Sequence, residues 1–241
     1  MVSFSPETIL QIGALPITNT LLDTLLVDAL LIGGTFYINK RLTLIPSNFL
    51  QNAMESIIET FFSLTESIAQ HAASKIFPYF MSFFLFILFI NWSSLIPGVG
   101  TIGIWKDNEL IPLLRGATSD LNTTLGLALV SAFATHMLSI KIIGIKDYLG
   151  RYFSLNPINL FVGVLEIISE LTKIVSLSFR LFGNIYAGEV VLLTVSSIFA
   201  FVVPLPFLLL EVIVGMVQAL VFSMLTMVFM AILTTSHKKA H

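Results

Sequence analysis

Six charged side chains lie within two long apolar segments in the C-terminal part of the chain. They are Glu166, Glu170, Lys173, Arg180, Glu189 and Glu211. Ionisable side chains inside a membrane are costly, and by default they mark an ion pathway or a functional ion pair. A structural Arg–Glu lock between two helices would use only two of the six. We therefore expect the group to conduct ions, with a structural lock as the alternative.

Helical spacing assigns these residues to different faces. One stripe of the first segment holds Ser169, Lys173, Ser176, Arg180 and Asn184, and Glu166 extends it toward the cytoplasmic end. Glu189 follows Arg180 by nine residues, which places it about 180° around a helix and about 13 Å along it. We therefore expect Glu189 to face the last segment, where Glu211 and Gln218 share one side.

Arg180 stands between the two polar routes that this pattern predicts. A guanidinium stays protonated in proteins, so it is a poor proton relay but a good fixed positive charge. It would block a proton wire that joined the two routes directly, and it would attract a carboxylate of a partner. The pattern thus predicts two routes with closed inner ends, which only a moving carrier can connect.

The composition of the 241 residues is that of a membrane protein, since 56% are hydrophobic and 11% are charged. Soluble domains carry about 25% charged residues, so lipid must cover much of this surface. The net charge of −2 gives no reason to expect nucleic acid as a partner, and the absence of cysteine excludes disulfides and thiolate sites. The four histidines predict no metal site, and we expect no cofactor.

Apolar runs of about 20 residues predict membrane helices. We expect about five, at residues 21–38, 77–95, 121–140, 158–197 and 207–235, in one all-α polytopic domain that comprises residues 1–241. Residues 47–74 carry apolar side chains at helical spacing, which predicts an amphipathic helix on the membrane surface. The fourth segment would be about 60 Å long as a helix, against a hydrocarbon core of about 30 Å. We therefore expect the last two helices to be long, tilted and antiparallel.

The distribution of basic residues predicts the orientation. One side of the membrane would hold Lys40, Arg41, Lys75, Lys141, Lys146, Arg151, Lys238 and Lys239, and the other only Lys106 and Arg115. The positive side faces the cytoplasm or matrix, so the N-terminus is expected outside and the C-terminus inside. The first twenty residues show neither a signal peptide nor a transit peptide. We expect a bacterial plasma (inner) membrane or a mitochondrial inner membrane.

The remaining polar residues receive mostly structural interpretations. We expect Asp120 and Asn122 to cap the third span or, alternatively, to line an outer entrance. We expect Asp147 and Arg151 to form a solvated loop pair, Lys106, Asp107, Glu109 and Arg115 to lie in an exposed outer loop, and His136 to be a core histidine with satisfied hydrogen bonds. Asp23 and Asp28 lie in the first span, and their roles stay open.

Several motifs in order along the chain identify a family resemblance. The stretch SLSFRLFGNIYAGEVV resembles the signature of subunit a of F-type ATP synthases, the stator of a membrane rotary motor. Supporting matches are PITNTLLDT, LIPG, ATSDLNTTLGLAL and VQALVFSMLTMVFM. The resemblance implies that Arg180 is the essential arginine that faces the carboxylate of the c-ring, with Asn184 and Gln218 close to it. It also implies that Glu189 and Glu211 belong to the outer half-channel, and Glu166, Ser169, Lys173 and Ser176 to the cytoplasmic one.

The resemblance also implies partners and a role. The partners would be the c-ring of multiple c subunits, the peripheral-stalk b subunits, the rest of the ATP synthase and membrane lipid. The chain would be no enzyme by itself, and it contains no GxxxxGK[ST] phosphate-binding motif. A secondary ion-coupled transporter is the alternative, but such proteins show internal repeats and broken helices, and the sequence indicates neither. Whether H⁺ or Na⁺ is carried stays open.

Overall fold

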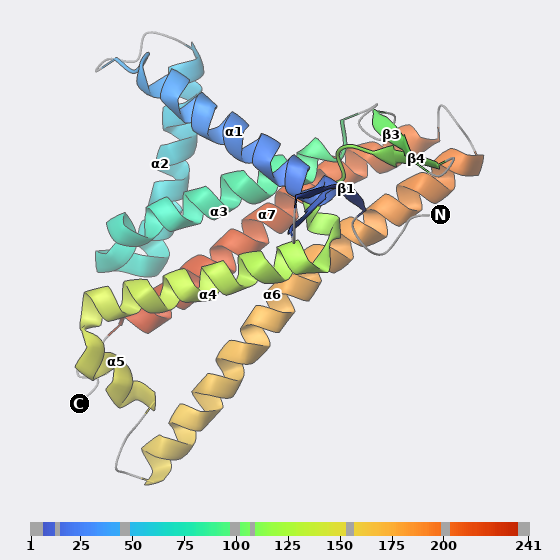
Figure 1. The fold of residues 1–241 in the computed structure, drawn as a ribbon. Coiled ribbons are helices and arrows are strands. Elements are labelled where there is room, and N and C mark those ends of the chain that lie inside the picture. Colours follow the sequence, from blue (N-terminus) through green and yellow to red (C-terminus); the bar gives the residue numbers. More distant parts are fainter. Residues whose placement is uncertain are drawn as a thin grey trace. The chain divides into compact units, whose positions relative to one another are not determined.

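The computed structural model describes residues 7–12, 15–43, 49–96, 102–106, 109–152, 157–198 and 203–235. Seven α-helices occupy most of this part of the chain (Figure 1). They are α1 (Asn19–Asn39), α2 (Phe49–Ala69), α3 (Ala73–Ser93), α4 (Leu121–Ile143), α5 (Ile145–Tyr152), α6 (Pro157–Ile198) and α7 (Pro204–Thr234). The predicted all-α fold is confirmed, with two short β-hairpins added to it.

The helices fall at all five predicted spans. Among the described residues, four helical stretches are long and apolar enough to cross a membrane, judged by length and composition: Asn19–Asn39, Gln51–Ser93, Leu121–Ile143 and Pro204–Thr234. The fifth predicted span, α6, is a continuous helix of 42 residues. It is not among the four, and it carries five charged residues, Glu166, Glu170, Lys173, Arg180 and Glu189.

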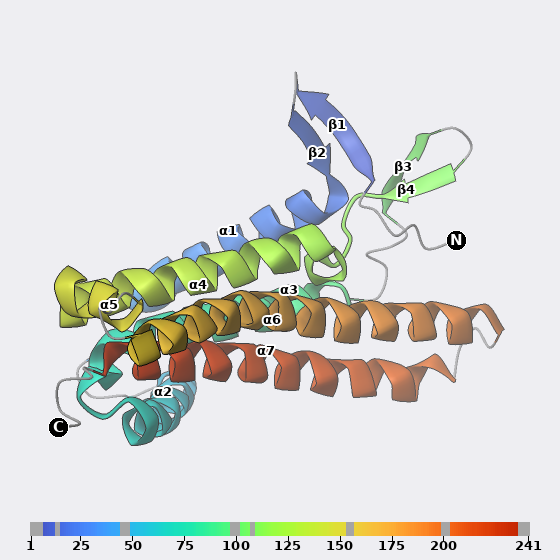
Figure 2. The same cartoon turned by 90° about the horizontal axis from the view of Figure 1, so that it is seen from below.

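The helices contribute segments to two compact units, and the first comprises Met1–Arg41, Phe83–Thr124 and Phe179–Val221. In it, β1 (Thr8–Ile12) pairs with β2 (Leu15–Thr18), and β3 (Gly103–Lys106) with β4 (Glu109–Pro112), both antiparallel (Figure 2). A small apolar cluster forms around Val27, Ile90 and Ala117. The second half of α6 and the first half of α7 run antiparallel beside each other, as predicted (Figures 1 and 2).

Side chains of α3 fasten α7 in this first unit through the backbone of α7. Asn91 Nδ2 donates to the carbonyl oxygen of Gly215 at 3.0 Å, and Trp92 Nε1 donates to that of Val212 at 3.2 Å. Asn91 Oδ1 in turn accepts from the hydroxyl of Thr118 at 2.8 Å. The close approach of α3 to Gly215 depends on the absence of a side chain there, because a Cβ would lie 3.2 Å from that of Asn91.

The second unit comprises Leu42–Ser82, Leu125–Ser178 and Phe222–His241. Its core is formed by buried residues of α2, α3, α4 and α7, among them Ala69, Ile76, Phe80, Leu138 and Met227. The amphipathic helix predicted at residues 47–74 is present as α2, which packs Phe61 and Ile68 against this core and leaves other residues exposed. Here too a side chain binds the backbone of α7, since Ser139 donates to the carbonyl oxygen of Leu233 at 2.6 Å.

Two local features begin and end α4. Asp120 caps its N-terminus, because its Oδ1 accepts from the backbone N–H of Asn122 at 3.0 Å. At the other end Gly144 adopts φ 86°, a left-handed conformation that glycine accommodates without strain. Its N–H donates to the carbonyl oxygen of Ile140, and its own carbonyl oxygen accepts from Tyr148, so α5 follows at once. This turn determines where the side chains of α5 point.

Candidate functional site

The predicted site residues of the first unit begin with Arg180, on an exposed side of α6. Gly183, Asn184 and Ala187 are exposed on neighbouring turns. The amide Nδ2 of Asn184 donates to Oε1 of Gln218 on α7 at 2.7 Å, and Gln218 is buried. The structure therefore brings Asn184 and Gln218 into contact, one turn of helix beyond Arg180.

The two carboxylates predicted for the outer half-channel also lie near each other. Glu211 is buried, and it packs on α6 at Gly188, where an added Cβ would lie 2.7 Å from its Oε1. Glu189, the next residue of α6, interacts electrostatically with Glu211. The prediction that Glu189 faces the last helix agrees with this arrangement.

A third charged residue joins them, and the sequence interpretation missed it. Nε of Arg115 lies 3.9 Å from Oε1 of Glu189, and its side chain is only 9% exposed. The expectation that Arg115 lies in an exposed outer loop is therefore wrong. The surrounding proline and glycine suggest a solvated loop, and nothing in the local pattern indicates that the guanidinium turns inward. Of the other charges expected in that loop, Lys106 and Glu109 belong to β3 and β4, and Asp107 lies outside the described residues.

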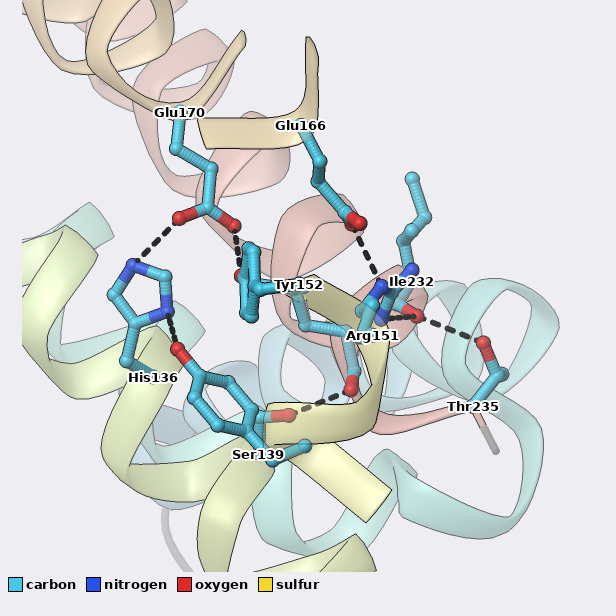
Figure 3. A network of polar contacts seen from close by, with 10 residues as sticks. His136, Ser139, Arg151, Tyr152, Glu166, Glu170, Ile232 and Thr235 are labelled. Atoms are coloured by element: carbon cyan, nitrogen blue, oxygen red, sulfur yellow. Dashed lines mark hydrogen bonds and ion pairs between the residues drawn. The ribbon is translucent and has the colours of Figure 1, made fainter. Parts of the chain in front are cut away.

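In the second unit Glu166 belongs to an ion pair. Nε of Arg151, at the end of α5, lies 2.6 Å from Oε1 of Glu166 on α6 (Figure 3). A second nitrogen of Arg151 donates to the carbonyl oxygen of Ile232 on α7 at 3.4 Å. The expected solvated loop pair of Asp147 and Arg151 is therefore wrong, because the turn at Gly144 begins a helix that directs Arg151 toward α6.

A second polar group links α4, α5 and α6 beside this pair (Figure 3). Nε2 of His136 lies 3.0 Å from Oε2 of Glu170, and the other carboxylate oxygen of Glu170 accepts from the hydroxyl of Tyr152 at 2.6 Å. Nδ1 of His136 is 2.9 Å from the hydroxyl of Tyr148. The hydrogen bonds of His136 are satisfied as expected, but its side chain is 29% exposed, so the residue is not in the core.

A small cavity opens beside His136 and Glu170. It has a volume of about 30 Å³, and its polar lining consists of Ser131, Thr135, His136, Glu170 and Lys173. The ammonium group of Lys173 lies 4.5 Å from the centre of the Phe229 ring. Ser169 and Ser176 are exposed on α6 and do not line the cavity. Of the predicted cytoplasmic residues, the structure thus places Glu166 in an ion pair, Lys173 at the cavity and the two serines on the exposed surface.

At the N-terminus of α4, Asp120 is buried and Asn122 is exposed. The capping interpretation of Asp120 is confirmed by its hydrogen bond, and the entrance role stays a prediction. Asp23 acquires structural partners, since its Oδ2 accepts from the hydroxyl of Ser93 at 3.0 Å and from the N–H of Ala117 at 3.3 Å. Asp28 is half-buried.

Comparison with known proteins gives one consistent result. Residues 21–231 match a family model described as "ATP synthase A chain". The chain is 32% identical to ATP synthase subunit a of Moorella thermoacetica over 98% of this chain and 100% of the relative. It is also 32% identical to ATP synthase subunit a 2 of Pelobacter propionicus, over 93% of this chain and 90% of the relative. The same identity holds for ATP synthase subunit a 1 of Hahella chejuensis, over 92% and 86%.

Proposed function

Since the chain belongs to the ATP synthase A chain family, we propose that it is the stator past which a ring of c subunits rotates. It is a multi-pass integral membrane protein of an F-type ATP synthase and acts in ion transport and ATP synthesis. In the proposed mechanism it provides two offset half-channels, each open to one side of the membrane. A ring carboxylate takes an ion from one and delivers it to the other.

The exposed face around Arg180 is the observation that carries this proposal. A permanently charged guanidinium on the exposed side of a membrane helix can attract the carboxylate of a neighbouring subunit. Gly183 and Ala187 lie exposed on the same part of α6, and small residues let a neighbouring helix approach closely in a membrane. A ring helix with a carboxylate fits both features. Gln218 holds Asn184 beside Arg180 and keeps this face polar.

The two half-channels are proposed at the two groups of polar residues. Glu189 and Glu211, with Asn184 and Gln218, form the outer half-channel, and Asp120 and Asn122 stand at its entrance. Glu166, Ser169, Lys173 and Ser176 form the cytoplasmic half-channel. Arg180 separates them and prevents protons from passing directly between the two.

The proposal includes the surroundings of the chain. Its partners are the c-ring, the peripheral-stalk b subunits and the soluble head, which performs the nucleotide chemistry, so the chain is no enzyme by itself. The excess of basic residues on one side places the N-terminus outside and the C-terminus in the cytoplasm or matrix. The membrane is a bacterial plasma (inner) membrane or a mitochondrial inner membrane.

Arg180→Ala tests the proposal. We expect the complete ATP synthase to assemble and ATP-driven proton pumping to fall to background, because no fixed charge then displaces the ring proton or separates the half-channels. Pumping is measured in inverted vesicles, and assembly by the amount of soluble head bound to the membrane. Arg41→Ala is the matched control, since Arg41 is an exposed arginine that lies over the Tyr37 ring. Normal coupled pumping in Arg180→Ala would refute the proposal.

A further inference from the structure

We propose that His136, held by Glu170 and Tyr148, is a proton-exchange site of the cytoplasmic half-channel. The inference rests on the proposed function and adds a residue of α4 to a route otherwise assigned to α6. It arises from the contacts between α4, α5 and α6 in Figure 3. The competing interpretation is a purely structural lock between these helices.

The geometry around His136 suits both charge states of an imidazole. Its Nε2 faces a carboxylate oxygen of Glu170 at 3.0 Å, and its Nδ1 faces the hydroxyl of Tyr148 at 2.9 Å. A hydroxyl can donate or accept. When the imidazole is neutral, Tyr148 donates to Nδ1; when it is protonated, Nδ1 donates to the oxygen of Tyr148. The ring can therefore gain or lose a proton while both contacts stay in place, which a structural lock does not require.

The surrounding tyrosines remain protonated as this arrangement requires. Burial raises the pKa of Tyr152, and its hydrogen bond to Glu170 raises it further. Burial also raises the pKa of Tyr148. Tyr152 donates to Glu170 and leaves the other carboxylate oxygen for His136. Glu170, Tyr148 and Tyr152 thus act as positioning residues for the imidazole.

The other charged groups near His136 lie on α6 and α5. On α6 they are Glu170, Lys173 and Glu166, and on α5 the charged group is Arg151, which pairs with Glu166 close to Tyr148. On α7 the cavity is lined by the apolar Phe229 and Leu233. Residues 132–140 of α4 contain no other charge. Glu170 is therefore the anionic partner in direct contact with His136 and the group that stabilises its protonated form.

The cavity provides the water that the exchange needs. Its volume of about 30 Å³ exceeds the roughly 10–15 Å³ that one buried water requires. Ser131, Thr135 and Lys173 supply polar groups that can hold such a water. In the exchange, the Tyr148 hydroxyl passes its proton to Nδ1 while its oxygen takes one proton from water, which gives the imidazolium, and the reverse step returns one proton to water. Glu170 stays a carboxylate, and no other bond changes.

Two substitutions in the complete ATP synthase test the proposal. Glu170→Gln keeps the size of the side chain and removes its charge, and His136→Asn removes the titrating ring. Passive proton conductance is measured in inverted vesicles after removal of the soluble head, per assembled membrane sector and as a function of pH on the cytoplasmic side. Positioned proton-transfer groups account for roughly 100-fold or more of a step, so we expect the conductance to fall about 100-fold in His136→Asn.

The pH profile separates proton exchange from a structural lock. Proton exchange on an imidazole makes the conductance depend on pH, and we expect this dependence to be lost in His136→Asn. In Glu170→Gln the pH profile should change, because the imidazole loses the carboxylate oxygen that lies 3.0 Å from its Nε2. Glu170→Asp, which keeps a carboxylate, should restore most of the conductance. Ser139→Ala, on the same helix, is the control and should leave the profile unchanged.

An unchanged conductance and pH profile per assembled sector in both variants would overturn the proposal, even if less complex assembled. A loss of the same size in Ser139→Ala would do so too, because it would point to packing. If either variant fails to assemble, the other supplies the comparison, and an unchanged conductance and pH profile in that variant alone would overturn the proposal. Arg180→Ala is measured in parallel: normal pumping there refutes the stator mechanism itself, a result independent of the His136 profile.

Discussion

Asn91→Leu tests how the first unit is held together. Asn91 is 1% exposed and makes two hydrogen bonds, to the carbonyl oxygen of Gly215 at 3.0 Å and from the hydroxyl of Thr118 at 2.8 Å. Leucine has the same branched shape, with larger methyl groups, but makes neither bond. Each bond contributes about 0.6–1 kcal/mol inside a membrane protein. The hydroxyl of Thr118, which is also buried, loses its acceptor, and leaving it without one destabilises the folded protein by about a further 1–2 kcal/mol.

We therefore expect Asn91→Leu to lower the free energy of unfolding by about 3 kcal/mol. One kcal/mol shifts Tm by about 2–4 °C in a chain of this size, so Tm should fall by roughly 6–12 °C. The measurement is thermal unfolding in detergent, followed by circular dichroism. Trp92→Phe is the comparison, because Trp92 is 36% exposed and makes one bond, to Val212 at 3.2 Å. Trp92→Phe should lower the free energy of unfolding by less than about 1 kcal/mol.

A second substitution separates the lost bonds from the stranded hydroxyl. Thr118→Val placed in Asn91→Leu removes the unpartnered group, so about 1–2 kcal/mol should be recovered. If Asn91→Leu is as stable as the parent, or if Thr118→Val makes it less stable still, the reasoning from these two bonds is wrong. An equal loss in Trp92→Phe would show that burial does not decide the magnitude.

Two further substitutions address Asp23 and Gly163. Asp23→Ala should lower the free energy of unfolding by about 1–3 kcal/mol, because it leaves the buried N–H of Ala117 without an acceptor. Asp23→Asn keeps an acceptor oxygen and should lower this free energy clearly less. Equal losses in the two variants would contradict the argument. Gly163→Ala should lower Tm, because the added Cβ would overlap the carbonyl oxygen of Tyr152. Gly126→Ala should leave Tm unchanged or raise it, because no atom lies within 4 Å of the added Cβ. The reverse order of the two Tm values would refute the steric argument.

Length and apolar periodicity predict the helices well, because both are local properties. The predicted span 158–197 and α6 (Pro157–Ile198) agree within one residue at each end. The cap at Asp120 could be predicted because the side chain bonds its own helix. The two hairpins were not predicted, since each strand is only four or five residues long.

Contacts between helices could not be predicted from the spacing of residues along the sequence. Asn184 and Gln218 were predicted near Arg180 through the family resemblance, and the structure places those two in contact. The pairing of His136 with Glu170 joins two helices, and no periodicity connects them. Arg151 was misassigned because the direction of its side chain depends on the turn at Gly144, which neither charge nor hydropathy records.

The hydrogen bonds to α7 have a consequence for how its sequence can vary. In each unit, side chains of other helices bind its backbone carbonyl oxygens, at Val212 and Gly215 in the first and at Ile232 and Leu233 in the second. A carbonyl oxygen has two lone pairs, so those of Val212 and Gly215 can accept such a bond besides their helical ones, whereas Ile232 and Leu233 lie in the last turn of α7, where carbonyl oxygens lack the usual helical donor. The acceptor is present whatever the side chain, so Val212, Ile232 and Leu233 can be exchanged for other apolar residues over evolution without loss of these bonds. Insertion or deletion of one residue would displace the acceptors by about 1.5 Å and 100°, so α7 can drift in composition but is constrained in length.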